Sequence, residues 1–180
     1  EKNQEWARGI AERFGIAPTA IFLAASHTHS GPATCVSIFR VGGPPVESYI
    51  LQLRQTLIAT VERAKRDLRE ARLSIGRSTL SGFAINRRVT KDGMTVIAPN
   101  PDGIRDDEVT ALVFRDAEIR SVRAVLFHYT CHSTVMGDYR FTADYPGAAR
   151  RFVDAALPGA LAGFLAGCPG DLPTNRPDAR

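Results

Sequence analysis

The sequence lacks any long apolar run and is poor in lysine and cysteine. A helix that spans a bilayer needs about 20 consecutive apolar residues, so no such helix is predicted. Only three of the 23 basic residues are lysines, and no run of basic residues exceeds two. The arginines are scattered among acidic residues, as on solvated helix faces, and do not form the basic stripe with aromatics that is typical of nucleic-acid-binding proteins. Despite a net charge of +4, we expect no nucleic-acid partner.

Three cysteines are present, Cys35, Cys131 and Cys168, and none belongs to a C-x-x-C pair. Any disulfide scheme would leave one unpaired, so the cysteines decide neither the compartment nor a metal site. The first residues have no signal-peptide character, and no initiator Met begins the chain. We therefore expect the natural N-terminus to lie upstream, and the compartment is unknown from these residues.

The hydrophobic patterns alternate between helical and extended periods. With 180 residues and 44% hydrophobic content, the chain can bury one sizeable core. We predict the α/β class, with a mixed β-sheet flanked by helices and histidine-bearing loops at strand ends. The helices are expected at Trp6–Phe14, Val46–Leu68 and Asp144–Leu157, the strands at Ala20–Ala24, Arg72–Gly76, Val109–Phe114, Val122–Tyr129 and Ala160–Leu165, and a hairpin with an extended loop at Lys91–Asp107.

Two histidines follow the first predicted strand. His27 and His29 alternate with other residues just after Ala20–Ala24, so on an extended chain they share a face, roughly 7 Å apart. Two imidazoles at the start of a Gly-Pro loop suit a divalent metal bound by nitrogen, most often zinc. A lone His-x-His is common by chance, so the alternative of two ordinary surface or core histidines stays open on these residues alone.

A second pair of histidines lies near the end of another predicted strand. The run Val122–Tyr129 is almost continuously apolar, which is typical of a central strand buried on both faces. His128 and His132 share a face if that strand continues. Open α/β sheets bind ligands at strand ends. We therefore expect adjacent, central histidine-bearing strands and at least one histidine of each pair at the same metal.

Asp144 begins a predicted helix, with Pro146 in its first turn. An aspartate at this place is typically the N-cap, whose carboxylate accepts hydrogen bonds from the first turn. The alternative is a role in catalysis or in supporting the ligands of a metal.

Five short motifs occur in a fixed order along nearly the whole chain. They are His27–Pro32 (HTHSGP), Asn86–Arg87, Tyr129–Thr134 (YTCHST), Ala143–Gly147 (ADYPG) and Gly170–Asp171. In order and approximate spacing this set resembles the neutral/alkaline, non-lysosomal ceramidase family. The resemblance implies that residues 1–180 are the N-terminal portion of a single zinc-hydrolase catalytic domain, incomplete at both ends.

The resemblance also implies an activity and a set of site residues. It implies a zinc-dependent amidohydrolase in which metal-activated water attacks the N-acyl carbonyl of ceramide or a related lipid amide. By position, His27 and His132 resemble zinc ligands, and the family completes its site with a glutamate and a tyrosine beyond Arg180. His29 is similar to a histidine beside the zinc that handles protons or holds the substrate, and Arg87 to an arginine that contacts the carbonyl oxygen. Substrate-contacting or supporting roles are implied for Asn86, Asp144 and Asp171.

Those residue types fit the hydrolysis of an amide. Zinc lowers the pKa of bound water to ~7 and polarises a carbonyl. A guanidinium such as that of Arg87 can stabilise the developing oxyanion, and losing one such donor typically costs ~3 kcal/mol of barrier. An imidazole such as that of His29 can protonate the leaving nitrogen near neutral pH. Without the resemblance, Arg87 would be interpreted as an ordinary surface arginine.

Two departures from the family pattern bear on the substrate. The family continues its Gly-Asp motif with Val-Ser-Pro-Asn, whereas Leu172–Asn175 reads Leu-Pro-Thr-Asn. Pro173 has no hydroxyl, so Thr174 could replace the serine only if the loop shifted by one residue. The second departure is that the chain ends before the remaining ligands, so we expect residues 1–180 alone to be inactive. A metal-assisted esterase or phosphatase, and a non-catalytic member of the family, stay as alternatives.

The resemblance finally implies partners and a compartment. The partners are a small-molecule lipid amide as substrate and a membrane surface in peripheral contact, and no obligate protein partner is inferred. A secreted or periplasmic protein is suggested by the resemblance only.

Overall fold

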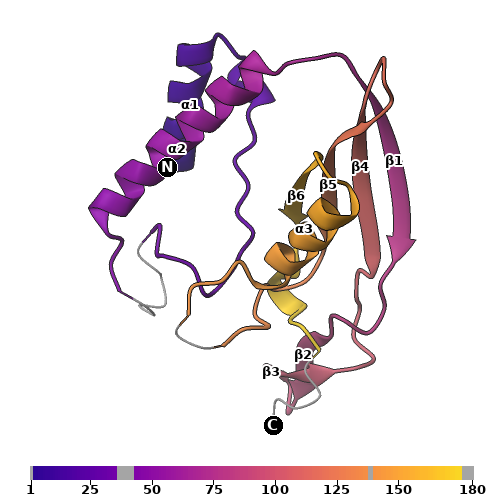
Figure 1. Cartoon of the computed structure of the whole chain (residues 1–180). Helices are drawn as coiled ribbons and strands as arrows, with labels where there is room; N and C mark the ends of the chain where they lie inside the picture. The colour runs from indigo at the N-terminus through magenta and orange to yellow at the C-terminus, as the bar shows by residue number, and fades with distance from the viewer. Residues whose placement is uncertain (1, 36–42, 138–139, 176–180) are drawn as a thin grey trace. The chain divides into compact units, whose positions relative to one another are not determined.

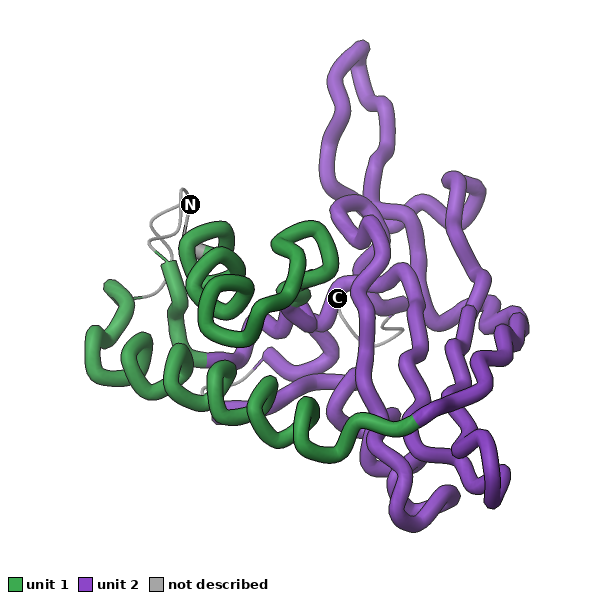
Figure 2. Tube along the Cα trace, turned by 90° about the horizontal axis from the view of Figure 1, so that it is seen from above, with its two compact units in different colours: residues 1–24, 32–69 green, residues 25–31, 70–180 purple. Residues whose placement is uncertain are grey.

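The computed structural model of the chain describes residues 2–35, 43–137 and 140–175. They form two compact units, which are described separately (Figure 2). The first lies within Glu1–Ala24 and Pro32–Arg69, and the second comprises Ala25–Gly31 and Glu70–Arg180. The short stretch that carries His27 and His29 therefore belongs to the same unit as His132.

In its described residues the first unit contains two helices and one 3₁₀ turn. Helix α1 (Lys2–Phe14) and helix α2 (Glu47–Arg66) confirm the two helical predictions, and η1 (Pro18–Ala20) lies between them. Gly15 has φ +63°, the left-handed conformation that glycine adopts after a helix end. The last turn of α2 carries Arg63, Lys65 and Arg66, whose charges complement the negative end of the helix dipole.

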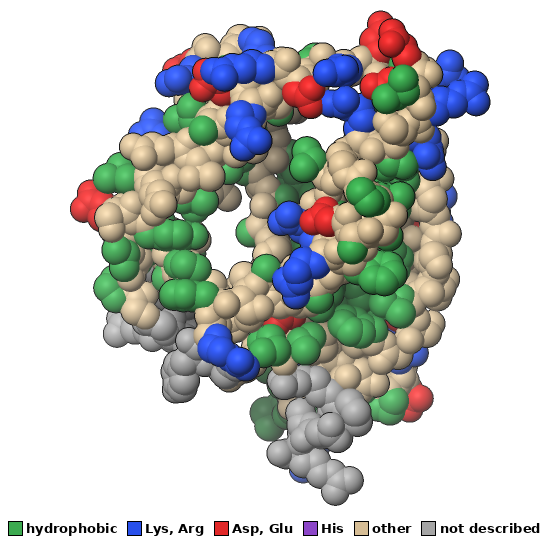
Figure 3. Space-filling view, in the orientation of Figure 1, with side chains coloured by type: hydrophobic (Ala, Val, Ile, Leu, Met, Phe, Trp, Pro, Cys, Tyr) green, Lys and Arg blue, Asp and Glu red, His purple; other side chains and the backbone are tan. Residues whose placement is uncertain are grey.

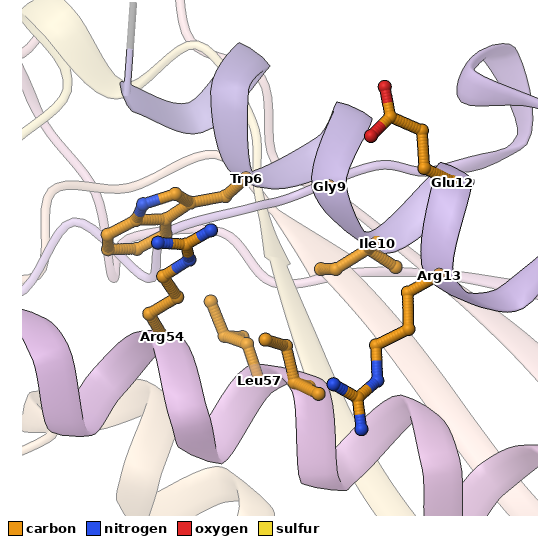
Figure 4. A pocket seen from close by; sticks show the side chains of 8 residues that line it. Trp6, Gly9, Ile10, Glu12, Arg13, Arg54 and Leu57 are labelled. Atoms are coloured by element: carbon orange, nitrogen blue, oxygen red, sulfur yellow. The ribbon is translucent and has the colours of Figure 1, made fainter.

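A pocket of about 530 Å³ lies between α1 and α2 (Figure 4). Its apolar wall includes Trp6 and Ile10 from α1 and Leu57 from α2, and the guanidinium groups of Arg13 and Arg54 lie at its margin. None of the predicted site residues lines this pocket.

The second unit is built on a four-stranded mixed sheet (Figure 1). The strand order is β1-β4-β5-β6, in which β1 and β5 both pair with β4 antiparallel and β6 pairs with β5 in parallel. Helix α3 forms the crossover between the parallel strands. The bounds are β1 Ala71–Thr79, β4 Glu108–Asp116, β5 Val122–Tyr129, α3 Asp144–Ala156 and β6 Leu161–Ala166. The predicted α/β class and mixed sheet are confirmed, with β5 in a central position.

The hairpin predicted within Lys91–Asp107 is formed by β2 (Asn86–Lys91) and β3 (Met94–Asn100), so it begins before the predicted bounds. Its two-residue turn has positive φ at both Asp92 and Gly93, 51° and 74°. This is the Asp-Gly turn that joins two strands with the right twist. The hairpin places Asn86 and Arg87 at the base of β2, close to the second 3₁₀ turn, η2 (Pro169–Asp171).

The prediction of a buried strand at Ala20–Ala24 is wrong. Ala20 ends η1, and residues 21–28 have no regular secondary structure. Phe22 is 82% exposed, and among the described residues no strand pairs with this stretch. His27 has φ +60°, which breaks the strict alternation of an extended chain. Among the described residues the apolar run has no partner strand to supply its backbone hydrogen bonds. Because His27 and His29 do not follow a strand, the prediction of two adjacent histidine-bearing strands is also wrong.

The core of the second unit lies at the end of β5. Tyr129 and Cys131 pack with Ala84 and Leu172, and the half-buried residues Phe83, Val109, Tyr145 and Phe164 pack against them. Both tyrosines are satisfied, because the Tyr129 hydroxyl donates to Leu80 O at 3.0 Å and the Tyr145 hydroxyl donates to Cys131 O at 3.0 Å. This packing fixes the backbone that leads into His132.

The surface carries mixed charges on the face shown in Figure 3. Lys and Arg side chains lie there among Asp and Glu and do not form one basic patch. None of the helices that the structure describes has the length and apolar character needed to cross a membrane.

Candidate metal centre

Three histidines converge within the second unit. One ring nitrogen from each of His27, His29 and His132 can be chosen so that all three lie within 4.8 Å of one another. The rings of His27 and His132 have centroids 4.7 Å apart, and the His27 and His29 Nε2 atoms are 3.4 Å apart. Two nitrogens bound to one tetrahedral zinc at about 2.05 Å are separated by roughly 3.3 Å. The three imidazoles could therefore hold a metal ion, and the spacing of the His27 and His29 nitrogens matches that of two ligands of one zinc.

His132 is the most rigidly held of the three. It follows β5 and is 5% exposed, and its backbone N–H donates to Leu172 O at 2.8 Å. Its Nδ1 forms a hydrogen bond with the carbonyl oxygen of Pro169. A carbonyl can only accept, so the proton resides on Nδ1 and the lone pair on Nε2. Metal-binding histidines typically have such a backbone partner on their other ring nitrogen.

His27 and His29 lie on an exposed segment that is tied to the chain after His132. The His29 N–H donates to Ser133 O at 3.3 Å, and the Ser133 hydroxyl donates to Ser26 O at 2.7 Å. Both histidine side chains are exposed, whereas His132 is buried. The cluster is therefore anchored on one side and open on the other.

The environment favours neutral imidazoles at two of the three positions. Burial lowers the pKa of His27 from its ordinary value, and the positive charges of His29 and Arg87 lower it further. Burial also lowers the pKa of His132; the Pro169 carbonyl opposes this shift, and His27, Arg87 and His29 add to it. Because only the neutral ring can donate its lone pair, lowered pKa values favour metal binding near neutral pH.

Arg87 lies close enough to the histidines for its charge to affect both His27 and His132. It comes from β2 and is half-buried, and its Nη2 donates to Gly170 O at 2.7 Å. That bond fixes the guanidinium next to the turn that also anchors His132. Arg87 therefore puts a positive charge near the histidine cluster.

Asn86 and Asp171 contact each other and connect the hairpin to η2. The Asn86 Nδ2 donates to Ile104 O at 2.9 Å and to Asp171 Oδ2 at 3.4 Å, while Asn86 Oδ1 accepts the Arg88 N–H at 2.8 Å. Arg88 also pairs with Asp171, at 3.7 Å. These bonds join the hairpin to η2, which presents the Pro169 carbonyl to His132.

The prediction that Asp144 is an N-cap is wrong. The N-cap position of α3 is Ala143, and Asp144 itself has φ +55°. Its buried carboxylate accepts the N–H groups of Val135 at 3.2 Å, Met136 at 2.8 Å and Tyr145 at 2.7 Å. The charged group is needed in the loop after His132, where two N–H groups would otherwise lack an acceptor.

Sequence reasoning missed two site contacts, and of the second histidine pair one member joins the cluster. Pro169 and Ser133 contact His132 and His29 through backbone carbonyls, which leave no signal in a side-chain pattern. His128 lies within β5 and does not belong to the cluster. Of the second pair, His132 alone therefore meets His27 and His29.

No family model and no curated protein sequence matches the chain. Two solved structures share its fold. The neutral ceramidase from Pseudomonas aeruginosa superimposes with a TM-score of 0.73 and 23% identity, over 98% of this chain and 31% of that chain. A structure described as ceramidase complexed with C2 gives a TM-score of 0.72 and 24% identity, over 96% of this chain and 29% of that chain.

The chain spans less than a third of the length of these two proteins. The likeness covers almost every residue of the chain, so it involves both units and not only the sheet. The resemblance indicated by the five motifs is thus confirmed at the level of the fold, which the chain shares with part of each of these two proteins.

Proposed function

We propose that the protein at its full natural length is a zinc-dependent amidohydrolase that cleaves the N-acyl amide bond of ceramide or a related lipid amide. The observation that carries the proposal is the convergence of His27, His29 and His132 within 4.8 Å, in a chain that has the fold of a ceramidase portion. Amide bonds are poor electrophiles, and a metal site is one of the few protein devices that activates both reactants.

His27 and His132 are the residues that would hold the ion. Their lowered pKa values favour the neutral form, and the Pro169 carbonyl directs the lone pair of His132 toward the cluster. When bound, zinc supplies Lewis acidity, which acidifies water and polarises a carbonyl. In this proposal the remaining ligands lie downstream of residue 180.

The chain's own residues supply the remaining steps. The Arg87 guanidinium, held by Gly170 O, stabilises the negative charge that develops on the carbonyl oxygen of the substrate. His29 lies next to His27 and is exposed, so its imidazole can take a proton from water and return it to the leaving nitrogen. The hydrogen bond between Asn86 and Asp171 holds the hairpin, which carries Arg87, against η2.

The segment after Asp171 favours N-acyl lipid amides as a class over ceramide alone. Ile85 N donates to Pro173 O at 3.0 Å and Asn175 N donates to Phe83 O at 2.7 Å, so the register of this segment is fixed. Thr174 is 7% exposed, and its hydroxyl has no hydrogen-bond partner among the described residues. A shift by one residue, which would let Thr174 replace the family serine, would break both backbone bonds.

The test is hydrolysis of a panel of N-acyl amides, acyl esters and phosphate esters by the full-length protein. We expect amide hydrolysis that is lost on treatment with a chelator and recovered with Zn²⁺. His132→Ala should abolish it, whereas His128→Ala, which changes a histidine outside the cluster, should keep it. Amide hydrolysis that survives chelation would reject the proposal, and a preference for phosphate esters or acyl esters would replace it with the corresponding hydrolase.

A further inference from the structure

Histidines and hydroxyl-bearing residues alternate in the segment Ser26–Ser30. Ser26, Thr28 and Ser30 are half-buried, while the intervening His27 and His29 are exposed. The hydroxyl-bearing residues are therefore more buried than the two histidines, whose rings lie against the ring of His132. This arrangement exists although the segment has no regular secondary structure.

Three hydroxyl groups link this segment to the chain that follows His132. The Ser133 hydroxyl donates to Ser26 O at 2.7 Å, the Thr28 hydroxyl donates to Thr142 O at 2.8 Å, and the Ser30 hydroxyl donates to Met136 O at 3.3 Å. Two backbone bonds add to them, from His29 N to Ser133 O and from Thr142 N to Ser30 O. We call Thr28, Ser30 and Ser133 the hydroxyl brace.

Ser133 is the central member of the hydroxyl brace. It is fully buried and directly follows His132. Its side chain holds the residue before His27, and its carbonyl holds the N–H of His29. His132 is itself held by hydrogen bonds to Leu172 and Pro169. Ser133 therefore ties the segment with the two exposed histidines to a part of the chain whose position is fixed.

We propose that the hydroxyl brace, with Ser133 at its centre, positions His27 and His29 around the ion that His132 binds; this rests on the metal centre of the proposed function. Without such bonds an irregular segment samples many backbone conformations, and ordering it on metal binding would cost conformational entropy. With the hydroxyl brace, the segment is already ordered when the protein folds, so metal binding does not have to order it. Residues that orient metal ligands typically change the affinity about 10–100-fold when they are substituted.

The test measures the Zn²⁺ affinity of the full-length protein by competition with a chromophoric chelator, and the visible spectrum of the Co²⁺-loaded form. Ser133→Ala should weaken binding about 10–100-fold and change the Co²⁺ bands. Thr28→Val keeps the side-chain shape without the hydroxyl and should also weaken binding, whereas Thr28→Ser should retain it. Val125→Ala is the matched control, because it truncates a buried residue of β5 outside the site.

The outcomes separate the brace from the proposed function. Wild-type affinity and spectrum in both Ser133→Ala and Thr28→Val would overturn the brace, and so would a loss no larger than that in Val125→Ala. If Ser133→Ala fails to fold, the Thr28→Val and Thr28→Ser pair decides. Zinc binding that depends on the brace without any amide hydrolysis would overturn the proposed function alone. A wild-type protein that binds no zinc would overturn both.

Discussion

The Nδ1 atom of His132 forms a hydrogen bond with the backbone carbonyl of Pro169, 37 residues further along the chain. This bond joins the end of β5 to η2 and leaves Nε2 as the only ring nitrogen of His132 with a free lone pair. In the same turn, the carbonyl oxygen of Gly170 accepts a hydrogen bond from the Arg87 guanidinium. One 3₁₀ turn therefore orients a predicted metal ligand and a predicted oxyanion-stabilising group together, which makes the following predictions specific to single residues.

His29 is predicted to handle protons and not to bind the ion. His29→Ala in the full-length protein should keep bound zinc while kcat falls about 10²–10⁴-fold, the usual contribution of a general acid or base. Because the side chain is exposed, added imidazole should restore part of the rate. Its Nε2 lies 3.4 Å from that of His27, so loss of zinc in this variant would instead identify His29 as a third ligand.

Arg87 is predicted to act in the transition state. Arg87→Ala should lower kcat by about 10²–10³ with zinc content unchanged, because an oxyanion loses its charged donor. Arg87→Lys should recover only part of the rate, since an ammonium group lacks the planar fork that can bond Gly170 O and a substrate oxygen together. Arg72→Ala, on exposed β1, is the control. Kinetics within twofold of wild type for Arg87→Ala would contradict the assignment.

Asp144 is predicted to stabilise the loop after His132 through its carboxylate. Asp144→Ala leaves the Val135 and Met136 N–H groups without their acceptor and puts alanine at φ +55°. We expect the free energy of unfolding to fall by about 3 kcal/mol.

Two further substitutions separate the causes. Asp144→Gly avoids the backbone strain at this positive φ, but it still lacks the hydrogen bonds of the carboxylate. Asp144→Asn keeps one acceptor oxygen, and asparagine tolerates this φ. Urea unfolding should rank the stabilities Asn, Gly, Ala in descending order. An alanine variant within 0.5 kcal/mol of wild type, a margin roughly that of an ordinary surface substitution, would show that these bonds contribute little.

Alkaline pH is predicted to destabilise the core of the second unit. Burial raises the pKa of Cys131 to about 12 and that of Tyr129 to about 12, and it also raises the pKa of Tyr145. As pH rises from about 9 toward 12, the unfolded chain loses protons that the folded chain keeps. Stability is therefore full below pH 9 and declines above it, by at most about 1.4 kcal/mol per pH unit for each group.

Urea unfolding in the presence of a chelator, from pH 8 to 10.5, measures this decline without interference from metal. Cys131→Ala should lower stability at pH 8 and make the decline between pH 9 and 10.5 shallower, because one titrating group is gone. Cys168→Ala, which changes an exposed cysteine, should keep the wild-type slope. Equal slopes in wild type and Cys131→Ala would contradict the prediction.

The elements with strong hydrophobic periodicity were predictable from the sequence. Helix α2 and strand β5 were placed to within a few residues, since their apolar patterns extend over many positions. The stretch before His27 was predicted as a strand and is not one. Its apolar residues match a strand pattern, but Ala20 and Ile21 donate to the nearby carbonyls of Ala17 and Pro18, and among the described residues no strand pairs with this stretch. The presence or absence of a partner strand is invisible to a local pattern.

The convergence of His27 and His132 was predictable from the sequence, whereas the contacts that hold them in place were not. His27 and His132 were expected to meet, and their rings lie 4.7 Å apart; that expectation came from the order of motifs, since spacing alone left surface histidines as an alternative. The role of Asp144 was misjudged because a carboxylate before a proline in a first turn usually caps a helix. The Pro169 carbonyl could not be predicted, because every residue carries a carbonyl.

The measurement that tests the metal centre most directly is the zinc content of the full-length protein and its histidine variants after dialysis against trace zinc. The account predicts about one zinc per wild-type chain, near zero for His27→Ala and His132→Ala, and the wild-type amount for His128→Ala. Full zinc content in either His27→Ala or His132→Ala, or none in the wild type, would contradict it.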